Sequence, residues 1–439
     1  MIKYLQCQIV ILSLTKFIRL IIILPRLSCK SLLRAAGLES CGFMDTITPP
    51  KHVRQVLFTL QSHGYGAYLV GGCVRDMILG VQPNDWDICT SALPEEVMAL
   101  FPKTVATGLK HGTVTVMIGK HGVEVTTFRS DGEYLDHRHP KNVSYVLDLN
   151  TDLSRRDFTM NAMAISAEGI ISDPFGGMRD IADQCIRCVG DPELRFEEDA
   201  LRMFRALRFS ARLGFRIEEK TLAAIRRKAK NAASISAERV RDEMEKLLLT
   251  RSPETVEIVL ETGLLSVYAA PVQLTAQELC SLKLLPYKAH ERWCMFTWLL
   301  LKHGAIGSAE DFLAMLRLDR RTVQCVTEAI EILSSPAPRS SLEWKRLLRD
   351  YGVGTVSCAA RCRDAALNMN TYRELRAILK AGECFSLKQL AVNGDDLSAL
   401  GLKGQALGET LNFLLEYVME FPENNRRELL MYLAAAPED

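Results

Sequence analysis

The sequence has 439 residues, 48% of them hydrophobic and 24% charged, which is ordinary for globular domains and excludes a low-complexity chain. The length is enough for two to four domains. Because the formal net charge is only +1, the whole-molecule field gives no indication of a nucleic-acid partner, and local basic patches would have to provide that contact.

The thirteen cysteines are odd in number and follow no regular spacing, which indicates reduced thiols in a cytoplasmic protein. We interpret most of them as small buried hydrophobic residues. Cys185 and Cys188 form the one CxxC pair, and neither a second pair nor a neighbouring histidine completes a zinc site around it.

Residues 1–43 are expected to be an extension outside the fold, with Met44 as the start of the folded chain. Lys16 and Arg19 interrupt the apolar stretch 8–25, so it is shorter than the ~20 residues that a membrane span needs, and we expect no membrane association. A signal peptide, or a transit peptide rich in basic residues, remains an alternative.

From residue 44 to about 170 the pattern alternates between short strands and short helices. Val53, Val56, Leu57 and Leu60 recur at helical spacing, whereas Thr and Val alternate from residue 112 as they do in strands. In chain order, the pattern predicts helices at 53–63, 74–79 and 94–100, strands at 67–70, 86–89, 112–118 and 123–128, and a polar loop at 130–142.

After residue 190 the strand patterns stop and long helical patterns follow, beginning with 197–213, 218–228 and 237–249. When strand patterns are confined to one part of a chain and helical patterns to another, the fold is of the α+β class or has separate domains. We therefore expect an α+β fold in which an N-terminal head with a small mixed sheet precedes an all-α remainder.

Two aspartates, Asp85 and Asp87, stand one residue apart soon after the double glycine Gly71-Gly72. Because side chains at i and i+2 of a strand point to the same face, we expect both carboxylates to lie together. Glu124 lies in an alternating apolar segment and adds a third carboxylate. Adjacent carboxylates repel one another unless a cation lies among them, and Mg²⁺ prefers oxygen ligands. The pattern predicts a magnesium site for phosphoryl transfer, with solvated turn carboxylates as the alternative.

The double glycine also leads into a predicted helix that carries Arg75. Backbone N–H groups after Gly72, at a helix start, would form an anion site, and the planar fork of Arg75 suits a triphosphate. The alternative is an ordinary strand-turn-helix in which Arg75 pairs with Asp76. A second arginine pair, Arg155-Arg156, precedes an acidic residue and could contact phosphate or ribose, or could belong to an ordinary charged loop.

Asp199 and Arg202 are three residues apart in a predicted helix, so they share one face. The alternative for such a pair is a simple surface salt bridge. An acceptor beside a planar donor also matches the edge of a nucleobase, as Asp and Arg do in nucleic-acid recognition. Cytosine and adenine both present an amino donor next to an acceptor, whereas guanine and uracil do not. Such a pair would select C and A.

Several motifs follow one another along the chain, namely GGCVRD with NDWDI, HGTVTV, VEVTTFR, RRDFTMNAMA, DPFGGMRD, EEDALRMFRALRF and SAERVRDE. In this order and spacing, these motifs resemble those of bacterial class II CCA-adding tRNA nucleotidyltransferases and the related poly(A) polymerases. The resemblance covers roughly residues 65–245, and the C-terminal third is similar only in being helical.

The resemblance implies a seahorse-shaped molecule with a nucleotidyltransferase head at 44–183, a base-selecting neck at 184–243, a helical body at 244–330 and a helical tail at 331–439. It also implies roles for individual residues. Metal would be held by Asp85 and Asp87, with Glu124 as a third catalytic carboxylate, and the nucleotide would be bound by Gly72, Arg75, Arg156, Asp199, Arg202, Arg205 and Arg208.

The family adds CCA to tRNA 3′ ends from CTP and ATP without a nucleic-acid template. The resemblance therefore implies Mg²⁺ as cofactor and tRNA, CTP and ATP as partners, and it leaves a homodimer open. The alternatives are an enzyme that adds only A, a poly(A) polymerase and, in a different class, a non-catalytic RNA-binding protein. Candidate tRNA contacts are the basic segment 226–230 and the group Lys345, Arg346 and Arg349.

Overall fold

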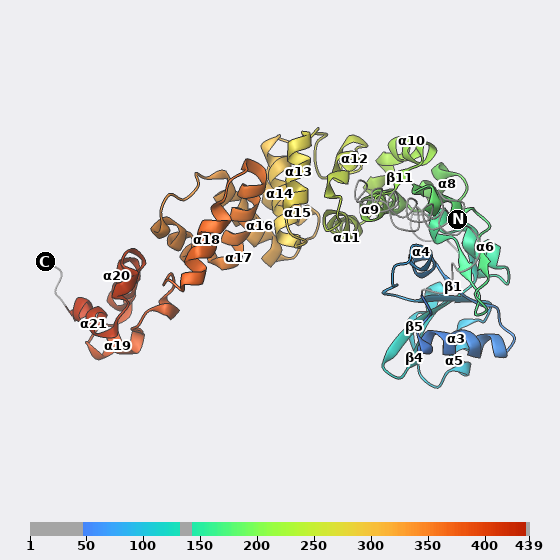
Figure 1. Cartoon of the computed structure of the whole chain (residues 1–439), viewed down its shortest axis with the longest axis horizontal. Helices are drawn as coiled ribbons and strands as arrows, with labels where there is room; N and C mark the ends of the chain where they lie inside the picture. The colour runs from blue at the N-terminus through green and yellow to red at the C-terminus, as the bar shows by residue number, and fades with distance from the viewer. Residues whose placement is uncertain (1–46, 132–142, 436–439) are drawn as a thin grey trace, which may run out of the picture.

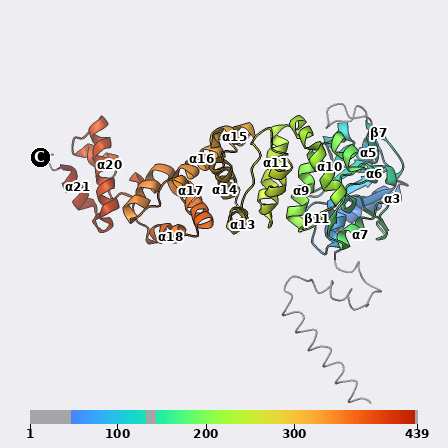
Figure 2. The same ribbon diagram turned by 90° about the horizontal axis from the view of Figure 1, so that it is seen from above.

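The computed structural model describes residues 47–131 and 143–435. They form an elongated, curved molecule with a sheet-containing head at one end and a helical tail at the other (Figure 1). Seen from above, the helical units follow one another in chain order (Figure 2). This arrangement agrees with the curved shape that the resemblance implies. The predicted extension 1–43 and most of the loop 130–142 lie outside the described residues.

The head is built on a seven-stranded mixed sheet with the strand order β3-β4-β5-β2-β1-β8-β9. Within it, β2 and β5 run parallel and the other neighbours run antiparallel. The pattern predicted four of these strands and missed the short or irregular ones, β3, β8 and β9. The strands are β1 (Ala67–Val70), β2 (Asp87–Thr90), β3 (Thr104–Gly108), β4 (Thr113–Ile118), β5 (His121–Thr127), β8 (Ala164–Ile165) and β9 (Ile171–Ser172), with a separate pair β6 (Arg129–Asp131) and β7 (Val143–Tyr145).

Helices α3 (Lys51–Ser62) and α5 (Pro94–Leu100) cover one face of this sheet. The apolar stripe of α3 packs in the same core as Leu69 and Ile88, which point to that face. Their strand neighbours Val70 and Cys89 belong to a smaller cluster on the other face. Alternation therefore places Asp87 on the face away from α3 and α5. The remaining head helices are α4 (Gly72–Ile78), α6 (Leu149–Ser154) and α7 (Gly177–Ala182).

The rest of the described chain is helical except for β10 (Cys185–Ile186), which pairs in parallel with β11 (Arg216–Ile217). One predicted helix, 197–213, is two helices that meet at Asp199 and Ala200. The helices are α8 (Pro192–Glu198), α9 (Leu201–Leu213), α10 (Glu219–Lys228), α11 (Ala237–Leu248), α12 (Val256–Glu261), α13 (Ala276–Leu284), α14 (Ala289–Lys302), α15 (Ala309–Met315), α16 (Arg320–Ser334), α17 (Ser341–Leu367), α18 (Thr371–Ala381), α19 (Gly394–Ala399), α20 (Gly404–Glu420) and α21 (Arg427–Ala435).

Besides the small cluster on the second face of the head sheet, two larger hydrophobic cores lie along the described residues. One runs continuously from the head to Ile378 in α18, and a second begins at Cys384 and ends at Leu430 in α21. The boundary expected at residue 331 falls inside the first core, because α17 packs closely on α14 and α16. We propose that the tail begins near Gly382. None of the described helices is both long and apolar enough to span a membrane.

Candidate active site

Three carboxylates of the head line one pocket of about 810 Å³. Asp87 opens β2 and is the register partner of Glu124 on the parallel strand β5. The neighbours of Glu124 on β5 are buried under α3, so Glu124 and Asp87 point to the same, opposite face of the sheet. Asp85 lies in the loop before β2, so the expectation that both aspartates sit on one strand is wrong. The loop nevertheless brings Asp85 into the same pocket.

The electrostatics of Asp87 reflect its burial and the carboxylates beside it. Burial raises the pKa of Asp87, the nearby carboxylates Glu124 and Asp85 raise it further, and Arg156 acts in the opposite direction. A group of carboxylates that raises the pKa of its own member binds a cation favourably, because the cation removes the repulsion. The oxygen-only donor set fits a hard divalent ion.

The backbone of Gly71 packs closely against Arg156, near the carboxylate site. Gly71 has a φ angle of 75°, a backbone conformation that residues other than glycine rarely adopt. A Cβ atom at Gly71 would lie 3.2 Å from Nη1 of Arg156 and 4.0 Å from Oδ2 of Asp87. Nη2 of Arg156 donates to Asp152 at 3.0 Å, and its buried Nε has no hydrogen-bond partner among the described residues. Arg156 and Asp87 thus both lie beside the glycine turn.

The guanidinium of Arg75 is hydrogen-bonded to other side chains of the protein, whereas a guanidinium free to bind phosphate was expected. Its Nε and Nη2 donate to Asp76 at 2.9 and 2.7 Å, and its Nη1 donates to Asn161 at 2.8 Å. The residue is only 3% exposed. Arg75 also lies 5.1 Å from the ring centroid of Phe209 in the neck. The alternative pairing with Asp76 is therefore the observed one, and Arg75 joins the head to α9.

Asp157 joins the head to the neck, a contact that pattern analysis of the head did not single out. Its Oδ2 accepts from Nε and Nη2 of Arg205 at 2.9 and 2.7 Å, and its Oδ1 accepts from Nδ2 of Asn161 at 3.0 Å. Burial alone would raise the pKa of Asp157, but the guanidinium of Arg205 and the amide of Asn161 lower it to about 2. The consecutive residues Arg156 and Asp157 thus point to different neighbours. Arg156 lies near the carboxylate pocket, and Asp157 pairs with Arg205 of the neck.

Replacing Asp157 by asparagine should lower the free energy of unfolding by about 2–3 kcal/mol at pH 7, because it leaves the partly buried Arg205 with only its 3.8 Å contact to Glu243 among the described carboxylates. Since the pKa of Asp157 is depressed on folding, its contribution is present above the unfolded pKa of ~3.9 and is lost as pH falls toward 2. Urea unfolding at pH 7 and pH 3 measures this difference, which should shrink at the lower pH.

The control for this change is Asp183→Asn, which removes a half-exposed carboxylate that lies 3.6 Å from Arg179. Such surface pairs contribute little, so the control should stay within ~0.5 kcal/mol of wild type at both pH values. Equal stability of the two variants at pH 7 would contradict the role of Asp157.

Asp199 and Arg202 both face the head–neck junction, but each is held by another partner. Asp199 follows the end of α8, its Oδ1 accepts from the N–H of Leu201 at 3.1 Å, and its Oδ2 accepts from Arg239 at 2.9 Å. Arg202 is 8% exposed and donates to Glu198 at 2.7 Å and to the carbonyl of Arg155 at 3.0 Å. The expectation that Asp199 and Arg202 lie on one helix is therefore wrong, because Asp199 precedes α9. Arg239 of α11 is an additional partner of Asp199.

The next arginines of α9 surround the buried ring of Phe209. The guanidinium carbon of Arg208 lies 4.2 Å from the ring centroid and that of Arg205 lies 5.4 Å from it. Arg208 is also paired with Glu243 of α11, and burial lowers the pKa of Arg208 despite this carboxylate. Arg205 and Arg208 thus join α9 to the head and to α11 through ion pairs. The resemblance implied instead that they contact phosphate or ribose.

The basic groups proposed for tRNA contact from the sequence are mostly neutralised. Arg226 pairs with Glu261 at 2.7 Å, and Arg227 pairs with Glu193 at 2.7 Å. Lys345 is 1% exposed and donates to the carbonyl of Met419 at 2.7 Å, so its expected surface role is wrong. Three further members also have acidic partners, namely Lys228 with Glu193 and Glu197, and Arg346 and Arg349 with Glu416.

A basic pocket of about 570 Å³ lies where the neck meets the body. Two of its arginines are four residues apart on α9, which was the only local signal for it in the sequence. The others come from α11 and from beyond it, so their proximity depends on tertiary packing. Its charged and aromatic lining residues are Arg208, Arg212, Lys246, Arg251 and Tyr287.

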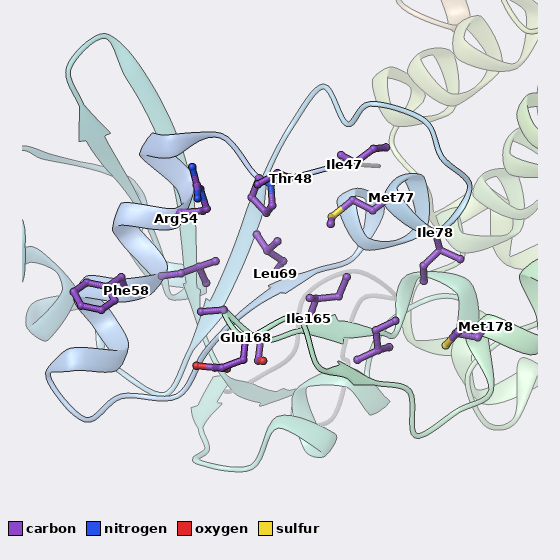
Figure 3. Close-up of a pocket in the computed structure, with 16 residues that line it drawn as sticks. Ile47, Thr48, Arg54, Phe58, Leu69, Met77, Ile78, Ile165, Glu168 and Met178 are labelled. Atoms are coloured by element: carbon purple, nitrogen blue, oxygen red, sulfur yellow. The ribbon is translucent and has the colours of Figure 1, made fainter. Parts of the chain in front are cut away.

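A different pocket, of about 450 Å³, lies between α3, α4 and the strands β8 and β9 (Figure 3). Its walls are mainly aliphatic, and Arg54 and Glu168 are its charged residues. It shares no lining residue with the carboxylate pocket. Its apolar lining does not suit a triphosphate or a hard cation, so we place the chemistry at the carboxylates.

A mixed-sheet head with clustered carboxylates beside a glycine turn, followed by a helical arm, defines a nucleotidyltransferase. Family models agree: residues 67–187 match a poly A polymerase head domain, 214–271 match a domain described as an RNA- and SrmB-binding site of polymerase A, and 287–434 match domain 2 of tRNA nucleotidyltransferases. The chain belongs to the CCA-adding enzymes.

Relatives support this assignment along most of the chain. The CCA-adding enzyme of Geobacillus sp. (strain WCH70) is 42% identical over 78% of this chain and 85% of its own length, and that of Geobacillus kaustophilus is 41% identical over 85% and 93%. The crystal structure of the Bacillus stearothermophilus CCA-adding enzyme in complex with CTP is similar with a TM-score of 0.74 and 34% identity, over 88% of this chain and 97% of that one.

Proposed function

We propose that this chain adds CCA to the 3′ ends of tRNA, using CTP and ATP, by metal-dependent nucleotidyl transfer that releases pyrophosphate. The observation that carries the proposal is the convergence of Asp85, Asp87 and Glu124 in one pocket beside Gly71 and Arg156. Membership of the CCA-adding enzymes supports the choice of tRNA as acceptor, and the similar enzyme solved with CTP supports the choice of nucleotide.

The carboxylate pocket fits a divalent cation, and we propose Mg²⁺ with Asp85 and Asp87 as its ligands. When bound there, the ion would activate the tRNA 3′-hydroxyl and neutralise charge on the phosphates. Glu124 is the register partner of Asp87 and would add negative charge beside the bound cation. Arg156, whose Nη1 lies beside the glycine turn, would donate to a phosphate oxygen near Gly72, at the start of α4.

Base selection is proposed for Asp199 and Arg202, which would exchange their present partners for the base. Asp199 would leave Arg239 to accept from the amino group of cytosine or adenine, and Arg202 would leave Glu198 to donate to the adjacent ring nitrogen. Because guanine and uracil present the opposite pattern there, they would leave both groups unpaired. Arg75, Arg205 and Arg208 would hold the neck in place for this reading.

The alternatives from the sequence are less well supported. An enzyme that adds only A, or a poly(A) polymerase, would not require cytosine selection, and the names of the relatives favour full CCA addition. A non-catalytic RNA-binding protein would not need clustered carboxylates that raise the pKa of Asp87. A cytoplasmic location is part of the proposal, and the free thiols among the described cysteines support it.

Chelation of divalent ions should stop nucleotide incorporation. With EDTA in excess, the rate of CTP incorporation into tRNA that lacks its 3′ CCA should fall by at least ~10³-fold, because several kcal/mol of transition-state stabilisation depend on the metal. Adding excess Mg²⁺ should restore the rate. Incorporation that continues at the original rate in EDTA would contradict the assignment of the carboxylate pocket.

We also propose that the basic pocket between neck and body contacts tRNA phosphates. Lys246→Ala and Arg251→Ala should each weaken tRNA binding and reduce the slope of log affinity against log salt by about one unit, as expected for one lost phosphate contact. The control is Lys283→Ala, which removes a half-exposed lysine that lies 3.3 Å from Glu254. Salt slopes equal to wild type in both variants would exclude this surface.

A further inference from the structure

Three cysteines of the body converge in its core. Cys294 on α14 and Cys358 and Cys362 on α17 are 0%, 2% and 0% exposed. One Sγ atom from each lies within 4.8 Å of the other two. Buried cysteines are usually isolated small apolar residues, so the convergence of three thiols from two helices calls for a specific explanation.

The geometry of the three thiols suits a shared ion. Two thiolates on one tetrahedral zinc ion lie about 3.8 Å apart, since Zn–S bonds are ~2.3 Å long, so closure from 4.8 Å or less needs only small rotations. A disulfide within α17 is disfavoured, because residues four apart on a helix have Cβ atoms ~5–6 Å apart and a disulfide needs ~3.5–4.5 Å.

The surroundings favour a cation over free thiolates. Burial raises the pKa of Cys362 well above its usual range, and Cys358 and the buried Glu291 contribute in the same direction. Its Sγ lies 3.5 Å from the carbonyl oxygen of Glu291. Without a cation the thiols therefore stay protonated, whereas a soft cation would stabilise their anionic forms.

A fourth, less buried thiol lies near the cluster. Cys325 on α16 is partly exposed and is among the groups that raise the pKa of Cys294. The hydroxyl of Thr355 on α17 lies 3.6 Å from its Sγ. Cys325 thus lies where α16 packs on α14 and α17, outside the group of three thiols.

We propose that Cys294, Cys358 and Cys362 form a binding site for one soft divalent cation of the zinc class. Each thiol that binds releases its proton to solvent, and no electron is transferred. The ion would join α14 to α17 within the body core. The site is separate from the carboxylate pocket, which offers oxygen ligands to a hard cation, so it does not depend on the proposed reaction.

The test uses the full chain, reduced and stripped of metal, titrated with Cd²⁺ as the probe. We expect one Cd²⁺ per chain, with the ultraviolet charge-transfer absorption of cadmium thiolates and an increase in melting temperature. Cys358→Ala and Cys362→Ala should each weaken binding by at least ~10-fold, because loss of even an indirect supporting group costs that much at metal sites. Cys384→Ala, a buried cysteine of the tail core, is the matched control and should bind as wild type does.

Absence of the thiolate band in the folded wild type, or equal binding by Cys358→Ala and Cys384→Ala, would overturn the proposal. If the core variants fail to fold, thiol reactivity of the wild type decides the question. Zn²⁺ should then protect three thiols per chain from a thiol reagent under mild denaturation. Protection of none would reject the site.

Discussion

Replacing Asp87 by asparagine is expected to abolish the addition of both cytidine and adenosine, with the rate falling by at least ~10³-fold. The amide keeps the shape of the side chain but removes a charged ligand, and metal-dependent transfer relies on several kcal/mol from charge stabilisation at the phosphates. Asp85→Asn should behave in the same way, since Asp85 lines the same pocket. Single-turnover incorporation of labelled CTP and ATP measures both rates.

The same substitution should leave the fold intact and stabilise the metal-free protein modestly. Because the pKa of Asp87 is raised on folding, its ionised form is disfavoured in the folded state, and stability is lost as pH rises through that raised pKa. A neutral amide removes this loss, so the melting temperature at pH 7 in EDTA should equal or exceed that of wild type. The control Asp183→Asn should retain full activity. Normal activity of Asp87→Asn would refute the metal assignment.

Replacing Arg202 by alanine is expected to weaken the choice between bases more than the rate of transfer. The planar fork of arginine matches one base edge, and such a contact contributes about 1–3 kcal/mol of discrimination. The ratio of kcat/KM for CTP over UTP should therefore fall by ~10–100-fold. Competition between the four nucleoside triphosphates, with product sequencing, measures this ratio.

Two further variants separate base selection from structure. Arg202→Lys keeps the charge without the fork, so it should lose selectivity as alanine does. Arg216→Ala removes an exposed arginine of the neck and should leave selectivity unchanged. If Arg202→Ala and Arg216→Ala select CTP over UTP equally well, Arg202 does not read the base.

Local patterns predicted the parts of the head that depend on local physics. The strand 67–70 and the helix 94–100 have the predicted bounds, because apolar alternation and a proline at the helix start act within a few residues. The shared face of Asp87 and Glu124 also follows from alternation, whereas their register on neighbouring strands depends on the strand order. Asp85 was misplaced, because the strand begins at Asp87.

Contacts between distant segments could not be predicted from the pattern. Asp157 and Arg205 are 48 residues apart, so their pairing depends on how α9 packs on the head. Asp199 and Arg239 are 40 residues apart, so their pairing depends on how α11 packs on α9. The break between α8 and α9 had a local signal, since an aspartate before an apolar run is a common helix start. Burial of Lys345 had none, because its partner carbonyl lies in α20.

The most direct measurement of the proposed function is the sequence of the product. Purified protein is incubated with tRNA that lacks its 3′ CCA, all four nucleoside triphosphates and Mg²⁺, and the extended 3′ ends are sequenced. We expect C, C and A in that order, followed by a stop. Extension by A alone, a run of A residues, or no extension at all would contradict the assignment of this chain as a CCA-adding enzyme.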